Sequence, residues 1–252
     1  MRPGALLLLG ALFAGALTRA AAQGGPPMIT DDPGTPGPGH WELNLAWTDQ
    51  RTPGSTGYGL PLVDASYGIG ERVELNYQAP WVVLRDSGQQ TLSGLGDSQL
   101  AVNWRFYDAG DAGWQASLFP RVFFLTPGSD SARRGLADSH TTWLLPLEVA
   151  RDFGFLAVGG EFGRMISADP DDAGWMGGVC VGRNLAKGVE LDAEIHATTG
   201  NRTSRSEITE NVGSRIALSE HAIVLLSIGR DLRDTLGPRS SLVSYCGIQL
   251  LR

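Results

Sequence analysis

The 252-residue sequence has little charge, almost no lysine and almost no cysteine. Charged residues make up 19%, against a usual value of about 25%, and Lys187 is the single lysine. Acidic residues outnumber basic ones by 27 to 20, which argues against a nucleic-acid partner because such a partner needs a basic surface. Two cysteines, Cys180 and Cys246, exclude a disulfide-rich scaffold and a zinc site built from several cysteines; we interpret both as small apolar residues within strands.

Long hydrophobic runs are missing after the first 22 residues. The early run, residues 5–17, follows Arg2 and precedes three alanines at 20–22, which is the pattern of a cleavable secretory signal peptide over residues 1–22. The alternative is a buried N-terminal helix. A spanning helix needs about 20 apolar residues, so an exported chain of this kind enters a membrane only as a closed barrel. We therefore expect a protein of the cell outer membrane, in a Gram-negative type of envelope.

Glycine and proline, by contrast, are plentiful, and they concentrate first in residues 23–39. Five prolines in this stretch exclude a helix or a central strand. We predict an extended periplasmic lead-in, which either hangs in the periplasm or folds into a lumen.

From residue 40 onward, apolar and polar residues alternate. Clear examples are WELNLAWT (41–48), VELNYQAPW (73–81), QLAVNWRF (99–106) and VELDAEIHAT (189–198). A period of two places apolar side chains on one strand face and polar ones on the other. Twelve strands are predicted near 40–49, 59–69, 72–83, 96–107, 113–125, 139–150, 154–166, 174–183, 188–199, 209–218, 221–231 and 240–251. Residues 40–252 are thus predicted to form an all-β, closed antiparallel transmembrane barrel of about 12 strands, within a range of 10 to 14.

The predicted connections alternate in length. Long ones include 49–57, 85–96 and 126–138, whereas 68–71 and 150–154 are short. Transmembrane barrels show this alternation because their periplasmic turns are short and their outer loops longer. A soluble exported β protein, which is the alternative, has no reason to sort its loops in this way.

Aromatic residues fall near both ends of the predicted strands, where amphipathic rings favour the two membrane interfaces. Those at the periplasmic ends are Trp41, Tyr67, Phe106, Trp114 and Phe155, and those at the outer ends are Trp47, Trp81, Phe124, Trp143 and Trp175. We expect these side chains to contact outer-membrane lipid. Core aromatics of a soluble fold are the alternative interpretation.

Four segments carry a resemblance to a known family. They are MITDDP (28–33), GHWELNL (39–45), YGIGERVELNYQAPW (67–81) and GLGDSQLAVNWRFY (94–107). With these segments the chain resembles the outer-membrane family linked to meta-pathway phenol degradation, whose members are described as transporters. The resemblance implies a porin-like barrel and transport of small molecules, hydrophobic or aromatic ones among them.

The polar strand faces are expected to line the lumen. The candidate lining residues are Glu42, Glu74, Asn76, Arg105, Arg121, Glu148, Glu190, Asp192, Glu194, His196 and Arg215. Glu190, Asp192 and Glu194 share one strand face and form an acidic rib, with Arg215 on the next strand. Charges in a narrow lumen should pair, so the set is either a structural network or a selectivity filter. As a filter, the rib favours cations.

Catalytic chemistry is not predicted. In Asp138-Ser139-His140, Ser139 cannot readily serve His140 if the two are neighbours in a strand, because their side chains then point to opposite faces. The acidic stretch DPDDAG (169–174) is a calcium-binding candidate, and a solvated acidic loop is the simpler interpretation. We expect no catalytic residues, no metal and no cofactor. The predicted function is a channel, with a plugged structural barrel, an outer-membrane hydrolase and a soluble exported β protein as alternatives; the pattern sets neither the solute nor the oligomeric state.

Overall fold

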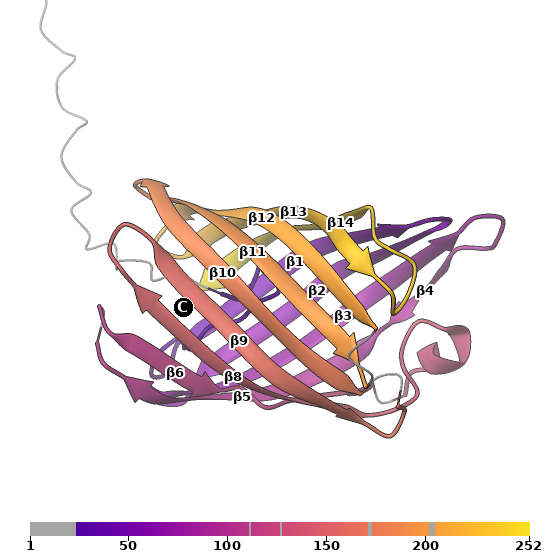
Figure 1. The fold of residues 1–252 in the computed structure, drawn as a ribbon, viewed down its shortest axis with the longest axis horizontal. Coiled ribbons are helices and arrows are strands. Elements are labelled where there is room, and N and C mark those ends of the chain that lie inside the picture. The colour runs from indigo at the N-terminus through magenta and orange to yellow at the C-terminus, as the bar shows by residue number, and fades with distance from the viewer. Residues whose placement is uncertain (1–23, 111, 127, 171–172, 202–204) are drawn as a thin grey trace, which may run out of the picture.

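A computed structural model describes residues 24–110, 112–126, 128–170, 173–201 and 205–252. The predicted signal peptide, residues 1–22, lies outside the described residues. The described chain folds into a closed antiparallel β-barrel of twelve wall strands (Figure 1), as the alternation predicts. Its strands are β1 (Trp41–Thr52), β2 (Ser55–Gly68), β3 (Val73–Asp86), β4 (Leu92–Leu95), β5 (Asp97–Asp108), β6 (Trp114–Leu118), β7 (Arg121–Leu125), β8 (Thr142–Asp152), β9 (Ala157–Ser167), β10 (Gly174–Ala186), β11 (Val189–Gly200), β12 (Ser206–Ser219), β13 (Ala222–Asp234) and β14 (Leu242–Leu251).

Fourteen strand segments make twelve wall strands because two of the wall strands are interrupted. β4 and β5 both pair with β3 and are separated by Gly96 alone. β6 and β7 both pair with β5 and β8, and the break between them falls at Phe119 and Pro120. Proline has no N–H for the ladder, which accounts for the second interruption.

The barrel closes where its first and last strands meet. β1 and β14 form an antiparallel ladder that runs from the Glu42–Leu251 pair to the Arg51–Leu242 pair. Closure joins the first strand to the last, which a strand structure needs if it is to span a membrane.

The outward face of the wall is apolar and the inward face is polar, the reverse of a soluble β fold. On β11, Glu190, Asp192 and Glu194 are buried, whereas Leu191 and Ile195 keep 42% and 57% of their surface exposed. This arrangement is the one that a surrounding lipid phase requires. No helix in the described part of the chain is long and apolar enough to cross a membrane.

The connections at the two ends of the barrel differ in length. Residues 69–72, 109–113, 153–156, 187–188 and 220–221 connect strands at one end, which we name the short-turn end. The other end, named the long-loop end, holds the connections 87–91, 126–141, 168–173, 201–205 and 235–241, with the 3-10 helix η1 (Ser131–Arg134) in the second of them.

Several predicted boundaries need correction. The connection expected over 49–57 is a two-residue turn, because β1 and β2 keep pairing up to Thr52 and Ser55. The strand predicted to begin at 139 begins at Thr142, and the one predicted to begin at 154 begins at Ala157. Polar and glycine-rich strand ends break the alternation, so the pattern misplaces them by a few residues.

The predicted interface aromatics lie on the outer surface in most cases. The exposed ones are Trp41, Trp47, Trp81, Phe106, Trp114, Trp143, Phe155 and Trp175, and the half-buried ones are Tyr67 and Phe124. Trp41 packs on Tyr67 with ring centroids 4.7 Å apart, and Trp175 stacks on Phe162 at 5.1 Å.

Candidate functional site: the barrel lumen

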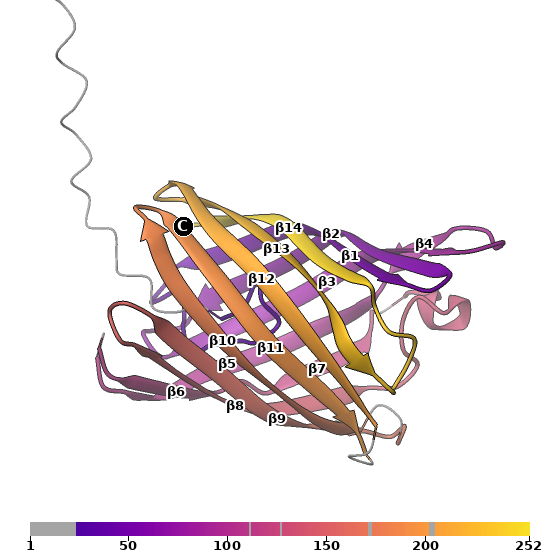
Figure 2. The ribbon, with the colours of Figure 1, turned by 45° about the horizontal axis from the view of Figure 1, so that its top comes forward.

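The chain before β1 lies inside the barrel. We name residues 24–36 the N-terminal segment; Figure 2 shows it within the ring of strands. Arg215 Nη2 on β12 donates hydrogen bonds to the carbonyl oxygens of Gly24 and Gly25, at 2.8 and 2.9 Å. Ser227 Oγ on β13 donates to the carbonyl of Pro27 at 2.9 Å. Of the two placements that the sequence left open, the structure has the lumenal one.

Glu194, a member of the predicted acidic rib, holds the middle of the N-terminal segment. Its carboxylate accepts hydrogen bonds from the backbone N–H groups of Ile29 and Thr30, both with shortest distances of 2.8 Å. Asn211 Nδ2 donates a further bond to Glu194 Oε1 at 2.7 Å. Hydrogen bonds to an ionised acceptor are roughly twice as strong as neutral ones, so this carboxylate is a clamp for the segment.

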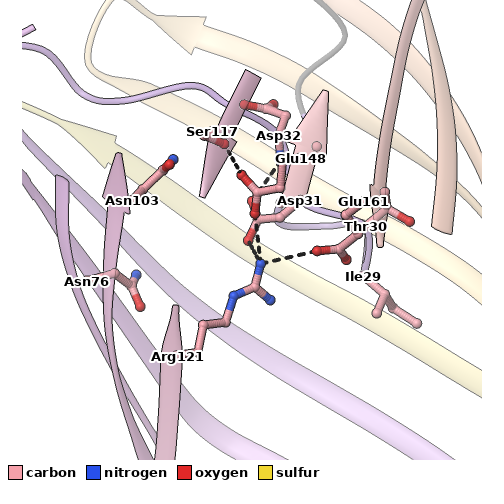
Figure 3. A network of polar contacts seen from close by, with 12 residues as sticks. Ile29, Thr30, Asp31, Asp32, Asn76, Asn103, Ser117, Arg121, Glu148 and Glu161 are labelled. Atoms are coloured by element: carbon pink, nitrogen blue, oxygen red, sulfur yellow. Dashed lines mark hydrogen bonds and ion pairs between the residues drawn. The ribbon is translucent and has the colours of Figure 1, made fainter. Parts of the chain in front are cut away.

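Arg121 on β7 forms a second clamp (Figure 3). Its Nη2 lies 3.1 Å from Asp31 of the N-terminal segment, 3.1 Å from Glu148 and 3.3 Å from Glu161. Ser117 Oγ donates to Glu148 Oε2 at 2.6 Å. Each of the three carboxylates is paired with the Arg121 guanidinium, which offsets the cost of placing them inside the barrel. Removal of the arginine would leave their negative charge buried without a compensating cation.

Glycines in the wall make room for the N-terminal segment. A Cβ at Gly178 of β10 would overlap Oγ1 of Thr30, and one at Gly213 of β12 would overlap Cε of Met28. The segment then turns back toward the short-turn end, where Asn103 Nδ2 donates to the Gly34 carbonyl at 2.9 Å and Thr35 Oγ1 donates to that of Glu71 at 3.0 Å. The inner surface of the wall is thus complementary in shape and hydrogen bonding to the N-terminal segment.

The rest of the lumen is a cavity of about 1950 Å³ that lies beside the N-terminal segment. Its lining includes Lys187 and His221 at the short-turn end, and Gln50 and Tyr58 toward the long-loop end. A second cavity, of about 390 Å³, lies at the long-loop end and shares Gln50 and Gly57 with the first. The cavity along the wall of β14, β1, β2 and β3 is thus lined by residues from both ends of the barrel.

That wall carries a chain of carboxylates and amides, which we name the β1–β3 acidic cluster; its members are Glu42, Asn44, Asp64, Glu74, Asn76 and Gln249. Asn44 Nδ2 lies 3.3 Å from both Glu42 Oε1 and Asp64 Oδ2. Asn76 Nδ2 donates to Asp64 Oδ1 at 2.6 Å, and Gln249 Nε2 donates to Glu42 Oε1 at 2.6 Å. Neutral amides therefore separate and hold the carboxylates of this cluster.

Nine of the eleven predicted lumen residues are buried: Glu74, Asn76, Arg121, Glu148, Glu190, Asp192, Glu194, His196 and Arg215. The other two, Glu42 and Arg105, are half-buried. In the structure, members of the predicted set fall into two groups. Arg121, Glu148, Glu194 and Arg215 hold the N-terminal segment directly or through a partner, while Glu42, Glu74 and Asn76 face the cavity.

Several residues of the two groups were not among the candidates, and they include Asp31, Asp64, Glu161 and Gln249. Glu161 alternates with Gly159 and Gly163 on β9, and a strand face made of glycines gives a weak periodic signal. Asp64 and Ser66 share a face of β2, so the period-two pattern of that strand could have identified Asp64 as a lumen residue.

The expectation for Ser139 and His140 is wrong. Both precede β8 and lie in an exposed loop, so strand alternation does not apply, and Ser139 Oγ lies 3.1 Å from His140 Nδ1. The stretch DPDDAG includes residues 171 and 172, which lie outside the described residues. Among the side chains that the structure describes, no three histidine, cysteine or acidic groups are arranged to hold a metal ion.

Comparisons with known proteins give similarity of fold. No protein-family model matches the chain, and no curated protein sequence matches it. Among solved structures, the COG4313 outer membrane channel from Pseudomonas putida F1 aligns with a TM-score of 0.69 and 15% identity, over 90% of this chain and 99% of that one. The NanC porin aligns with a TM-score of 0.61 and 10% identity, and the KdgM porin with 0.58 and 11%; each covers 83% of this chain, and 99% and 98% of their own chains, respectively. These likenesses place the chain among twelve-stranded barrels with the fold of outer-membrane channels.

Proposed function

We propose that this protein is an outer-membrane channel for small molecules, exported by the signal peptide at residues 1–22 and narrowed by its N-terminal segment. The observation that carries the proposal is the cavity of about 1950 Å³ inside a closed barrel, lined by residues from both ends. Solute would move along the wall of β14, β1, β2 and β3, past the N-terminal segment, and into the smaller cavity that shares Gln50 and Gly57.

The size of the barrel supports this proposal. Twelve strands lie between small barrels filled by side chains and the porins of sixteen or more strands that hold a wide water channel. A partly filled lumen is the expected outcome at this size, and the N-terminal segment occupies part of it.

The charge of the cavity wall bears on the solute. A KdgM porin has been solved in complex with disordered oligogalacturonate, whereas the cavity wall of this chain carries Glu42, Asp64 and Glu74. Carboxylates there disfavour anionic solutes. Neutral and cationic molecules are the proposed cargo, and neutral aromatic compounds would agree with the resemblance to the family linked to phenol degradation.

A plugged structural barrel without transport is the second candidate. It is favoured by the number of direct bonds between the N-terminal segment and the wall, which include those of Arg121, Glu194 and Arg215. In that case the cavity beside the segment would hold water and conduct nothing.

The test is planar-bilayer recording of the mature protein and of a variant that lacks residues 24–36. Conductance of the intact mature protein supports the channel, and a larger conductance of the shortened variant supports the narrowing role of the segment. Absence of conductance in both, with a heat-modifiable folded band on gels for both, would overturn the channel and leave the structural barrel.

A further inference from the structure

We propose that the β1–β3 acidic cluster is a binding site for the ammonium group of small organic cations within the channel. This inference deepens the proposed function, because it names a solute class for the same lumen. It rests on the charge of the cluster, on the unpaired acceptor that it contains and on its place at the cavity.

The carboxylates of the cluster lie close together with only neutral donors between them. Glu42 and Asp64 share Asn44 Nδ2 at 3.3 Å each, and Asp64 also accepts from Asn76 Nδ2. Glu74 follows on the same face of β3, two residues before Asn76. Like charges this close repel unless a cation joins them, and the amides supply partial charge alone.

Arginine side chains of the same wall do not reach the cluster. On β14, β1, β2 and β3 the basic residues are Arg51 and Arg85, both near the long-loop end. Arg51 is paired with Asp49 at 2.7 Å, and the Arg85 guanidinium lies over the ring of Tyr58. Across the lumen, Arg215 is held by the carbonyls of Gly24 and Gly25 and by Asp192, at 3.6 Å, and it also attracts the Glu42 carboxylate. Arg215 thus offsets part of the negative charge of the cluster, and the rest is directed at the cavity.

A second observation points to a donor-bearing ligand. The side-chain oxygen Oδ1 of Asn44 is buried without a hydrogen-bond partner, and Asn44 keeps only 2% of its surface exposed. Asn44 lines the cavity between Glu42 and Asp64. A buried acceptor that is left unpaired costs free energy, and a ligand that donates N–H to it would recover that cost.

The chemistry of the acceptors favours an ammonium group over a metal ion. Ammonium carries three N–H donors and no acceptor, and the cluster offers carboxylate oxygens and one free amide oxygen. Each of Glu42 and Asp64 already accepts bonds from amide N–H groups, so neither can give both oxygens freely. Calcium needs six to eight oxygen ligands, and the hydrogen-bonded carboxylates of the cluster do not provide that number.

The test measures binding directly, separately from conductance. Folded protein in detergent micelles is titrated calorimetrically with n-butylammonium chloride and, in parallel, with tetramethylammonium chloride, which has no N–H donor. The variant Glu42→Gln/Asp64→Asn/Glu74→Gln removes the charges of the cluster. The matched control, Asp152→Asn/Glu190→Gln/Glu220→Gln, removes three carboxylates that line the same cavity at its short-turn end.

We expect n-butylammonium to bind the unaltered protein. The cluster variant should lose roughly tenfold or more in affinity, as expected for the loss of hydrogen bonds to charged groups. The affinity of the control variant should stay within about twofold of that of the unaltered protein. Tetramethylammonium should bind more weakly than n-butylammonium. Equal losses in both variants, or equal binding of the two cations, would overturn the inference. Binding without conductance would keep the site and overturn the channel, whereas conductance without binding would keep the channel and overturn the site.

Discussion

The backbone N–H of Thr30 donates a hydrogen bond to Oε2 of Glu194 at 2.8 Å, although the two residues are 164 positions apart in the chain. The bond joins the segment before the first strand to the inner face of β11. It explains why an acidic residue lies at this lumenal position, and it makes Glu194 part of a clamp rather than a free charge in the passage.

The first prediction concerns this clamp. Glu194→Gln keeps the shape of the side chain but removes the charge that two backbone N–H groups share, so the N-terminal segment should loosen. Bonds to charged groups contribute about 1.5–3 kcal/mol. Single-channel recordings should show larger or more frequent open levels than in the unaltered protein. Glu190→Gln, on the same strand face, is the control, and an identical effect of both changes would contradict a specific clamp.

The second prediction uses the room that glycine leaves at the segment. Gly178→Ala would place a Cβ against Oγ1 of Thr30, and the segment would have to shift. Limited proteolysis from the short-turn side should then cleave within residues 24–36 more rapidly than in the unaltered protein. Gly57→Ala is the matched change, since a Cβ there meets nothing within 4 Å. Unchanged cleavage in Gly178→Ala would show that the segment is not held against β10.

The third prediction concerns the surface that faces lipid. Leu191, the third residue of β11 counted from the short-turn end, points outward with 42% of its surface exposed. Leu191→Arg should lower the free energy of unfolding by about 1–2 kcal/mol, between the values for the membrane interface and for the bilayer midplane. Urea titration in lipid vesicles, followed by the heat-modifiable band, measures the change. The inward neighbour Glu190→Gln should fold almost normally, and equal tolerance at both positions would argue against a surrounding bilayer.

The fourth prediction concerns orientation in the membrane. A cysteine in place of Arg133, whose side chain is 83% exposed in η1, should react with a membrane-impermeant maleimide on intact cells. A cysteine in place of Ala109, in a connection at the short-turn end, should react only after the outer membrane is permeabilised. Long loops outside and short turns inside predict this order, and the opposite order would reverse the topology.

The two acidic groups of the lumen show how far residue patterns reach. The pattern places Glu190, Asp192 and Glu194 on one inward face, and the register confirms their neighbourhood, since Glu190 pairs with Arg215 across β11 and β12. It also suggested that this rib faces the passage. The structure assigns Glu194 to the N-terminal segment, whereas Glu190 lines the cavity together with Glu42, Asp64 and Glu74 of β1, β2 and β3.

The sequence by itself determined the barrel: alternation over stretches such as 189–198 sets the inward and outward faces, and it does so because each strand residue follows a period of two whatever its distant neighbours are. The place of the N-terminal segment was decided only by the tertiary structure. Residues 24–36 have no periodicity, and their polar backbone groups are satisfied by Arg215, Glu194 and Asn103, which the closed ring alone brings together. Those contacts are long-range, and so no local pattern in the sequence encodes them.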